Sequence, residues 1–307
     1  MIALLLALGS SLAYGCADFL GGLGARKAHV LRTVLVAAPA SLAVEPALEK
    51  AQGNRNLATL VPLAPTRKRN PPMSAFRIDP AVAEAFPDTL IALVTATGLR
   101  GREPWPRTTA ALAELERRLA DGTWRPADET DPRIEAWHTA YRAFGTNPRR
   151  VRPSVDALGR RLAKKGTLPR INPAVDSYNA VSVRHGLPAG AFDLDRVTGD
   201  VDIRYADGTE SFTPLGEPGT IETPNPGEII YADTTGVLTR HWNHRDAHRT
   251  RVTEDSTRVA FLLETLHATR DGDLLKVAAD TLQGLLAPHS GHSTVHYLSP
   301  AQPRATV

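Results

Sequence analysis

The chain has 307 residues, a length that accommodates one large domain or two modest ones. Apolar residues make up 42% of it and charged residues 22%, with a net charge of +3, which is typical of a globular protein. The single cysteine excludes an intramolecular disulfide framework and a cysteine-rich zinc site, and it favours a reducing compartment, here the cytoplasm.

The N-terminal segment differs from the rest of the chain. Ile2–Leu23 carries one charge, Asp18, and is long enough to cross a bilayer, with Arg26 and Lys27 directly after it. The run resembles the first membrane helix of EamA-like drug/metabolite transporters, but nothing downstream is comparably apolar, so transport is not predicted. We expect residues 1–44 to be an apolar helical segment from a joined or mis-started gene. A genuine membrane anchor and a buried soluble helix are the alternatives.

A linker is predicted over residues 45–72, because prolines recur there and no hydrophobic period is present. Met73 directly follows and is the only methionine after Met1. Residues 73–307 are enough for one domain with a hydrophobic core.

The first half of this domain combines one strand with four helices. Thr89–Thr97 is apolar and β-branched, as expected of a buried strand. The fourth helix has clear boundaries, because Asn172 is a good N-cap residue, Pro173 suits the first turn and Gly186 suits the C-terminal stop. The predicted helices are Thr108–Leu119, Asp131–Phe144, Ser154–Lys165 and Pro173–His185.

Short strands and then two helices are predicted in the second half. Asp207-Gly208 is a hairpin signal between two of the strands. The predicted strands are Val201–Tyr205, Glu210–Thr213, Gly227–Ala232 and Gly236–His241, and the predicted helices are Ser256–His267 and Asp273–Leu286. The pattern indicates one domain of alternating helices and strands over residues 73–288, and a disordered tail over residues 289–307.

Basic residues gather between Thr146 and Arg170, where Asp156 is the one acid. Such a composition is typical of a phosphate-binding surface, and RNA is the candidate ligand. A solvated helix face is the alternative. The candidate RNA-binding residues are Arg149, Arg150, Arg152, Arg160, Arg161, Lys164 and Lys165.

Motifs for metal, nucleotide or nucleophilic chemistry are weak. His241, His244 and His248 have a spacing that could hold a metal, but arginines lie among them and would repel a cation, so no metal is predicted. The sequence contains no phosphate-binding glycine loop and no serine nucleophile elbow, so no cofactor is expected. If the domain hydrolyses a substrate, we expect water to be the nucleophile, positioned by a carboxylate.

Three acids are candidates for the carboxylate that would position the water. Asp193 and Asp195 follow a Gly-Ala turn and suit turn and cap positions. Glu264 lies inside an apolar run that is predicted to be helical, which would place it beside an apolar stripe. An acid in such a position needs a hydrogen-bonding partner or a functional role.

The order of motifs from Ile171 to Glu264 resembles the B3/B4 editing module of the phenylalanyl-tRNA synthetase beta subunit. The shared residues are Val175-Asp176, Asn179, Gly186, Pro188, Ala191-Phe192-Asp193, Asp195, Gly199, Arg204, Gly208, Glu210, Val252-Thr253, Thr257 and Phe261–Glu264. The resemblance implies the B3/B4 fold, an α+β fold in which helices flank a mixed sheet. One departure is Gly190, which stands where the family has histidine.

That resemblance also implies a function, because the module binds misacylated tRNA and hydrolyses the wrong aminoacyl ester. By resemblance Asn179 and Glu264 are the candidate catalytic residues, and Gly190 and Phe192 belong to the pocket. We therefore expect a trans-acting aminoacyl-tRNA deacylase with tRNA as partner and no synthetase active site. A non-catalytic RNA-binding module, which Gly190 favours, is the alternative. Either would be membrane-anchored if the N-terminal helix is genuine.

Overall fold

The computed structural model describes residues 74–307. The predictions for residues 1–44, for the linker over residues 45–72 and for Met73 lie outside the described residues. Within the described part, every helix is too short or too polar to meet the requirements of a bilayer-crossing segment.

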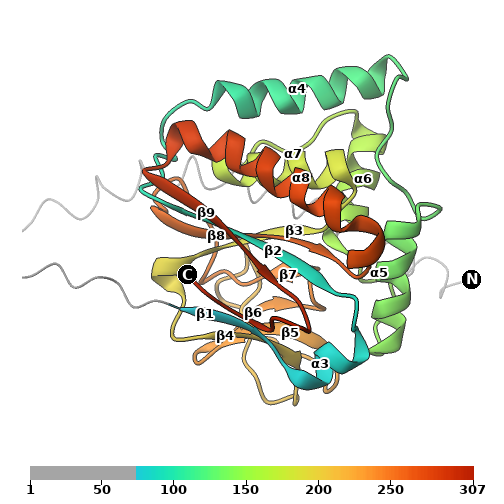
Figure 1. Ribbon diagram of the computed structural model, residues 1–307, viewed down its shortest axis with the longest axis vertical. Helices are drawn as coiled ribbons and strands as arrows, with labels where there is room; N and C mark the ends of the chain where they lie inside the picture. The colour runs from blue at the N-terminus through green and yellow to red at the C-terminus, as the bar shows by residue number, and fades with distance from the viewer. Residues whose placement is uncertain (1–73) are drawn as a thin grey trace, which may run out of the picture. The chain divides into compact units, whose positions relative to one another are not determined.

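Two sheets form the centre of the described domain (Figure 1). The first has the order β10-β1-β4-β5-β6-β7, in which β1 pairs with β4 in parallel and all other pairs are antiparallel. Its strands are β1 (Ala75–Ile78), β4 (Val201–Tyr205), β5 (Ile229–Asp233), β6 (Gly236–Arg240), β7 (Arg245–Asp246) and β10 (Arg304–Thr306).

The second sheet is antiparallel throughout and has the order β3-β8-β2-β9. Its strands are β2 (Leu90–Thr97), β3 (Ala189–Asp193), β8 (Arg258–Thr265) and β9 (His292–Leu298). Side chains alternate between its faces, so Ile91 and Leu93 pack in the core that includes the first sheet, whereas Ala92 and Val94 pack with helical residues.

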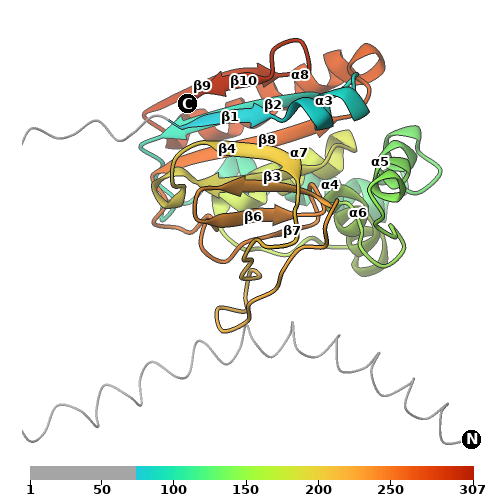
Figure 2. The same ribbon diagram turned by 90° about the horizontal axis from the view of Figure 1, so that it is seen from below.

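Helices cover the outer face of the second sheet, and α5 and α6 lie together at one end of the domain (Figure 2). The α-helices are α3 (Pro80–Ala85), α4 (Pro106–Ala120), α5 (Pro132–Ala143), α6 (Ser154–Lys165), α7 (Pro173–His185) and α8 (Ala268–Leu286), with 3₁₀ turns at Leu194–Arg196 and Ala287–His289. The α+β class predicted from the sequence is confirmed.

Local signals define α7 as predicted. The Asn172 side chain accepts a hydrogen bond from the Val175 amide at 3.0 Å, Pro173 occupies the first turn, and Gly186 ends the helix with φ 67°. Asp193 also has a capping role, because its side chain accepts from the Asp195 amide at 3.0 Å at the start of the 3₁₀ turn.

The prediction of a helix over Ser256–His267 is wrong, because these residues form the central strand β8. β8 pairs with β2 on one side and β3 on the other, and both of its faces are buried. A strand covered on both faces can be apolar at successive positions, as β8 is from Val259 to Leu263, and it then loses the period-2 alternation that identifies strands in a sequence. The segment Ala189–Asp193, read as a turn, is strand β3, whereas Glu210–Thr213 forms only an isolated bridge between Phe212 and Glu222.

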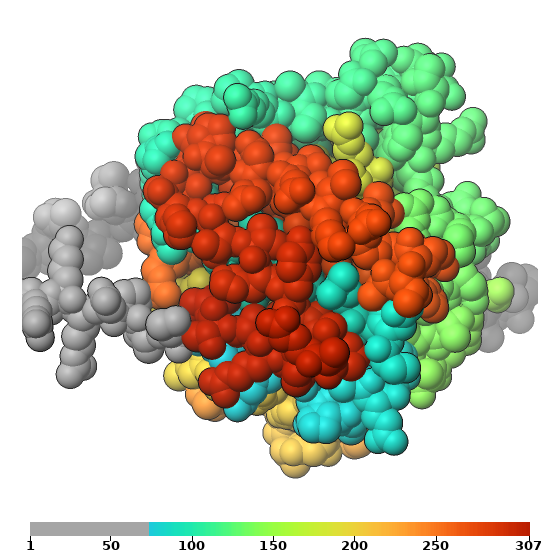
Figure 3. Space-filling model, viewed as in Figure 1, coloured from blue at the N-terminus to red at the C-terminus, as the bar shows by residue number. Residues whose placement is uncertain are grey.

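The disordered tail predicted over residues 289–307 is also wrong. His292–Leu298 forms β9 at the edge of the second sheet, and Arg304–Thr306 forms β10 beside β1. Figure 3 shows these C-terminal residues and α8 covering much of one face of the domain. The polar composition of β9 fits its position at a sheet edge, where most of its residues are only half-buried.

Candidate functional site

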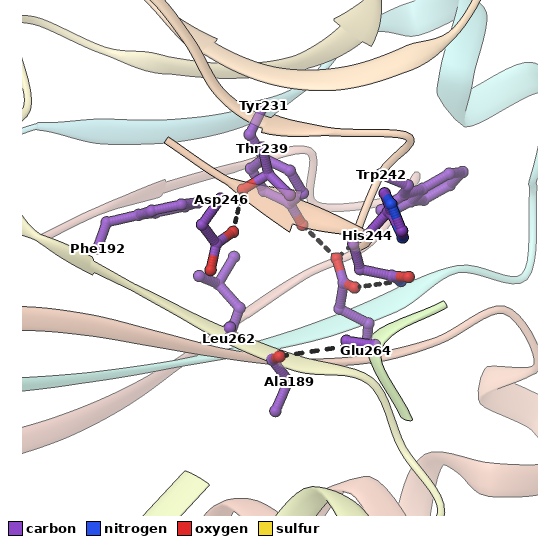
Figure 4. A pocket seen from close by; sticks show the side chains of 12 residues that line it. Ala189, Phe192, Tyr231, Thr239, Trp242, His244, Asp246, Leu262 and Glu264 are labelled. Carbon is purple, nitrogen blue, oxygen red and sulfur yellow. Dashed lines mark hydrogen bonds between the residues drawn. The ribbon is translucent and has the colours of Figure 1, made fainter. Parts of the chain in front are cut away.

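A small cavity with both polar and apolar lining residues lies between the two sheets (Figure 4). Its volume is about 40 Å³, which is room for a few water molecules. Strands β3 and β8 of the second sheet form one wall, and residues of β5, β6, β7 and the β6–β7 turn form the other. The polar lining residues are Ser154, Tyr231, Thr239, Asn243, His244, Asp246 and Glu264.

Glu264 points into this cavity from β8 and is 2% exposed. It shares a strand face with Ala260 and Leu262, which pack in the core that includes the first sheet. Its Oε1 accepts hydrogen bonds from the Tyr231 hydroxyl and, at 3.1 Å, from Trp242 Nε1. Its Oε2 accepts from Asn243 Nδ2 at 2.8 Å.

The pKa of Glu264 is raised to about 7, chiefly because the carboxyl is buried. Hydrogen bonds from Tyr231, Asn243 and Trp242 favour the charged form and oppose this rise, whereas the negative charge of Asp246 adds to it. Glu264 can therefore both hold and release a proton near neutral pH.

A strained turn after β6 supplies two of the three donors. His241 and Trp242 have φ values of 49° and 68°, a region that non-glycine residues rarely adopt and that is common at functional sites. The Asn243 amide is fixed further because its Oδ1 accepts from the Tyr141 hydroxyl of α5 at 2.8 Å, which leaves Nδ2 directed to Glu264.

Asp246 is the second carboxyl in the cavity. Its Oδ1 accepts from the Thr239 hydroxyl at 2.8 Å, and burial raises its pKa to about 6 against the effect of that hydrogen bond. The neighbouring arginines are occupied elsewhere: Arg240 pairs with Glu228 and Glu222, and Arg245 with Glu217 and Glu222. Within residues 74–307, no ion pair involves Asp246.

The two pocket residues that the resemblance implies both line the cavity. Gly190 and Phe192 of β3 line it together with Glu264. A Cβ at Gly190 would meet no atom within 4 Å, so the cavity is open at this point. Asn179 is buried inside α7 at 5% exposure and does not line the cavity. The amide that contacts Glu264 belongs to Asn243 instead.

The predicted RNA-binding residues fall into two groups. Arg152 and Arg160 pair with the buried carboxylate of Asp156, at 3.2 Å and 2.6 Å, and Arg160 also pairs with Glu129. The other residues are exposed and form no ion pair within the described part of the chain: Arg149, Arg150, Arg161, Lys164 and Lys165.

The loop between α5 and α6 connects these cations to the cavity. The His244 Nδ1 atom lies 2.7 Å from the Arg152 carbonyl oxygen, and the Ser154 amide donates to the Asn243 carbonyl at 3.1 Å. The positive end of α6 therefore lies at the cavity, since Ser154 is both the first residue of the helix and a lining residue.

Two of the three histidines considered as metal ligands have hydrogen-bonding partners: His241 contacts Thr146, and His244 contacts the Arg152 carbonyl. His241 Nδ1 lies 2.9 Å from the Thr146 hydroxyl, and burial lowers the pKa of His241 to about 4. Among residues 74–307, no group of three or more His, Cys, Asp or Glu side chains has the arrangement of a metal site.

Comparison with known proteins shows what part of the chain is similar to. Residues 136–278 match the family model of the B3/4 domain. The chain is 36% identical over 80 residues to the phenylalanine-tRNA ligase beta subunit of Corynebacterium jeikeium, and 37% identical over 84 residues to that of Fusobacterium nucleatum. These matches cover 26% and 27% of this chain but only 9% and 10% of the two relatives, so the chain spans about a tenth of their length.

The beta subunit of Nocardia farcinica is 34% identical over 99 residues, which is 32% of this chain and 11% of that protein. Among solved structures, an N-terminal fragment of the phenylalanyl-tRNA synthetase beta subunit from Pyrococcus horikoshii superposes with a TM-score of 0.37 at 16% identity, covering 72% of this chain and 49% of that one. Residues 136–278 therefore match the B3/4 domain, and the chain is homologous to a segment of the phenylalanine-tRNA ligase beta subunit.

Proposed function

We propose that this protein binds tRNA and removes the amino acid from misacylated tRNA by hydrolysing the aminoacyl ester. The relatives are named for a reaction on tRNA, and their homology supports a tRNA-related role. The observation that carries the hydrolytic step is Glu264, a buried carboxyl that faces the cavity and has a pKa of about 7.

In the proposed reaction, Glu264 accepts a proton from a water molecule in the cavity while the water oxygen attacks the ester carbonyl carbon. The tetrahedral oxyanion collapses, the bond to the tRNA ribose oxygen breaks, and Glu264 returns the proton to that oxygen. The partial positive charge of the first turn of α6 lies beside the cavity and would favour the oxyanion, while the Ser154 amide itself already donates to the Asn243 carbonyl. Tyr231, Trp242 and Asn243 hold the carboxyl in place.

The exposed cations supply the binding surface in this proposal. Arg149 and Arg150 lie in the loop that contacts the cavity through Arg152 and Ser154, and the remaining exposed cations lie along α6. This arrangement would hold the phosphates of the tRNA acceptor end beside the cavity.

A non-catalytic tRNA-binding domain is the second candidate. Three donors already occupy the Glu264 carboxyl, and the cavity is only about 40 Å³. Both features suit a structural acid in a closed core as well as a general base. Hydrolysis has to be measured to separate the two candidates.

The experiment is a deacylation screen against a panel of mischarged tRNAs with the wild type and Glu264→Gln. The substitution keeps the shape of the side chain and removes its charge. We expect the deacylation rate to fall about 10²-fold or more, as for loss of a general base, while tRNA affinity stays within a few-fold. Glu84→Gln, the same change at an exposed position of α3, is the matched control.

Two outcomes would contradict the proposal. Deacylation by Glu264→Gln at the wild-type rate removes the catalytic role of this residue. A wild-type protein that binds tRNA but deacylates none of the panel favours the binding-domain candidate.

A further inference from the structure

The two carboxyl groups in the cavity differ in the number of hydrogen bonds that their oxygens accept. Both oxygens of Glu264 accept hydrogen bonds, from three donors in total. Among residues 74–307, Asp246 has one donor, Thr239, which binds Oδ1 at 2.8 Å. In Figure 4 its second oxygen points away from Thr239, on the side of Leu262. Asp246 is thus the acid with accepting capacity left for a ligand.

The charge around Asp246 is also uncompensated. Arg240 and Arg245 form ion pairs with glutamates, and Arg249 pairs with Asp233 at 2.8 Å. A carboxylate that is partly withdrawn from water attracts a cation strongly when none is already beside it.

We propose that Asp246 binds the ammonium group of the aminoacyl ester, so that the pocket takes esters of small amino acids with a free α-amino group. The identity of the ligand as an aminoacyl ester rests on the proposed function above. The ammonium group and the ester carbonyl are attached to the same α-carbon. An ammonium group on Asp246 therefore leaves the carbonyl inside the cavity that Glu264 also faces.

The chemistry of the cavity favours an ammonium group over a metal ion. Two carboxyl groups, one of them already holding three donors, are too few ligands for a divalent cation. An ammonium group needs few acceptors, and the free oxygen of Asp246 and the hydroxyl oxygen of Thr239 supply two in one place. The cavity volume of about 40 Å³ limits the bound amino acid to one with a small side chain. That side chain would lie in the open space beside Gly190.

The test is a binding measurement that does not depend on hydrolysis. The probes are 3′-alanylamino-3′-deoxyadenosine, in which an amide replaces the ester, and its N-acetyl derivative, which lacks the positive charge. Calorimetry with the full-length wild type should show that the free amine binds roughly ten- to a hundredfold more tightly, the range for a hydrogen bond to a charged group. Asp246→Asn should lose this preference, and Glu84→Gln, the control at an exposed position of α3, should keep it.

Asp246→Asn retains the size of the side chain and an acceptor for Thr239. If this variant does not fold, Thr239→Val replaces it, because loss of the hydroxyl frees the carboxylate from its fixed position. Thr239→Val should reduce the preference for the free amine. An unchanged preference in a folded Asp246→Asn or Thr239→Val variant overturns the proposal.

The same measurements separate this inference from the proposed function. Equal affinity of the wild type for the two probes, or no binding of either, overturns the role of Asp246 even if the protein deacylates tRNA. A preference that Asp246→Asn abolishes supports the role even if no mischarged tRNA is hydrolysed. Loss of the preference in Glu264→Gln but not in Asp246→Asn assigns the ammonium site to Glu264 and overturns the proposal.

Discussion

Glu264 is a buried acid surrounded by neutral donors, with no ion-pair partner among residues 74–307. Neutral donors stabilise a carboxylate less than a cation does, so desolvation dominates and the pKa rises to about 7. By contrast, the buried Asp156 has Arg152 and Arg160 as partners. A buried acid with neutral donors, such as Glu264, is suited to proton transfer. A buried acid paired with arginines, such as Asp156, is suited to a structural role.

The raised pKa of Glu264 predicts a pH-dependent stability. The pKa rises from 4.5 to about 7 on folding, so the native state binds the proton more tightly than the unfolded state. The resulting stabilisation is complete below pH 4.5 and is lost as the pH rises through 7. Relative to Glu264→Gln, the wild type should lose about 3 kcal/mol of unfolding free energy across this window. Urea unfolding of both proteins at several pH values measures the difference.

His185 and His241 also titrate with shifted pKa values, but they are present in both proteins and largely cancel in the difference. Asp246 interacts with Glu264 through its charge, so its titration is part of the measured difference. A difference that is flat between pH 4.5 and 7 would mean that Glu264 has an ordinary pKa. The proton-transfer role would then lose its physical basis.

Glu264 could be chosen as a candidate from the sequence, but the residues that donate hydrogen bonds to it could not. A glutamate within an apolar run is visible as an anomaly in the sequence. Tyr231, Trp242 and Asn243 reach it from β5 and from the β6–β7 turn, more than twenty residues away, because two sheets pack face to face. No local pattern reports such a contact, and Asn179, the amide expected at the site, lies in α7 instead.

Among the elements, the helices that end at a glycine and the strands β2 and β4 were predicted closely, whereas β3, β8 and β9 were not. α6 and α7 have the predicted bounds, since their stops at Gly166 and Gly186 are local backbone features in the left-handed region. The identity of β8 depends instead on β2 and β3, which are distant in sequence. The polar strand β9 likewise depends on pairing with β2.

The cap of α7 gives a prediction at this scale. Asn172→Ala removes the acceptor for the Val175 amide and the donor to the Val252 carbonyl, which lies 3.1 Å from Asn172 Nδ2. The unfolding free energy should fall by about 1–2 kcal/mol. Asn172→Ser keeps a capping oxygen and should lose less. Equal stability of the alanine variant and the wild type in urea would show that α7 does not depend on this cap.

The whole described domain depends on its C-terminal strands. β9 covers one side of β2, and β10 pairs with β1 at the edge of the first sheet. Deletion of residues 292–307 exposes the edge of β2 and removes the buried Leu298 side chain from the core, so we expect loss of cooperative thermal unfolding. Calorimetry of residues 73–291 and of residues 73–307 tests this. The fragment that keeps residues 292–307 should show a single sharp transition.

Charge reversal of four exposed cations tests the RNA surface. The reversed residues are Arg149, Arg150, Arg161 and Lys164, all changed to Glu. The variant should bind tRNA more weakly, and the slope of log affinity against log salt should decrease by about 0.7 to 0.9 for each phosphate that the variant no longer binds. Fluorescence anisotropy over a series of salt concentrations measures both quantities.

A matched control reverses the same number of exposed cations on other elements. Suitable positions, exposed and without an ion pair within residues 74–307, are Arg107, Arg184, Arg196 and Arg251. This control has the same net charge as the first variant, so it should retain most of the affinity if the α5–α6 region is the binding surface. Equal weakening in both variants would indicate attraction by net charge alone.

The pairing of β1 with β10 brings the two ends of the described domain together. The Ser74 amide donates to the Val307 carbonyl at 3.2 Å, and the Val307 amide donates to the Ser74 carbonyl at 2.9 Å. A short glycine-serine connection could therefore join residue 307 to residue 74. A circular permutant with new ends in the exposed segment around Gly219 would preserve every strand pairing in both sheets. Chain connectivity at this edge is thus separable from the architecture that forms the cavity.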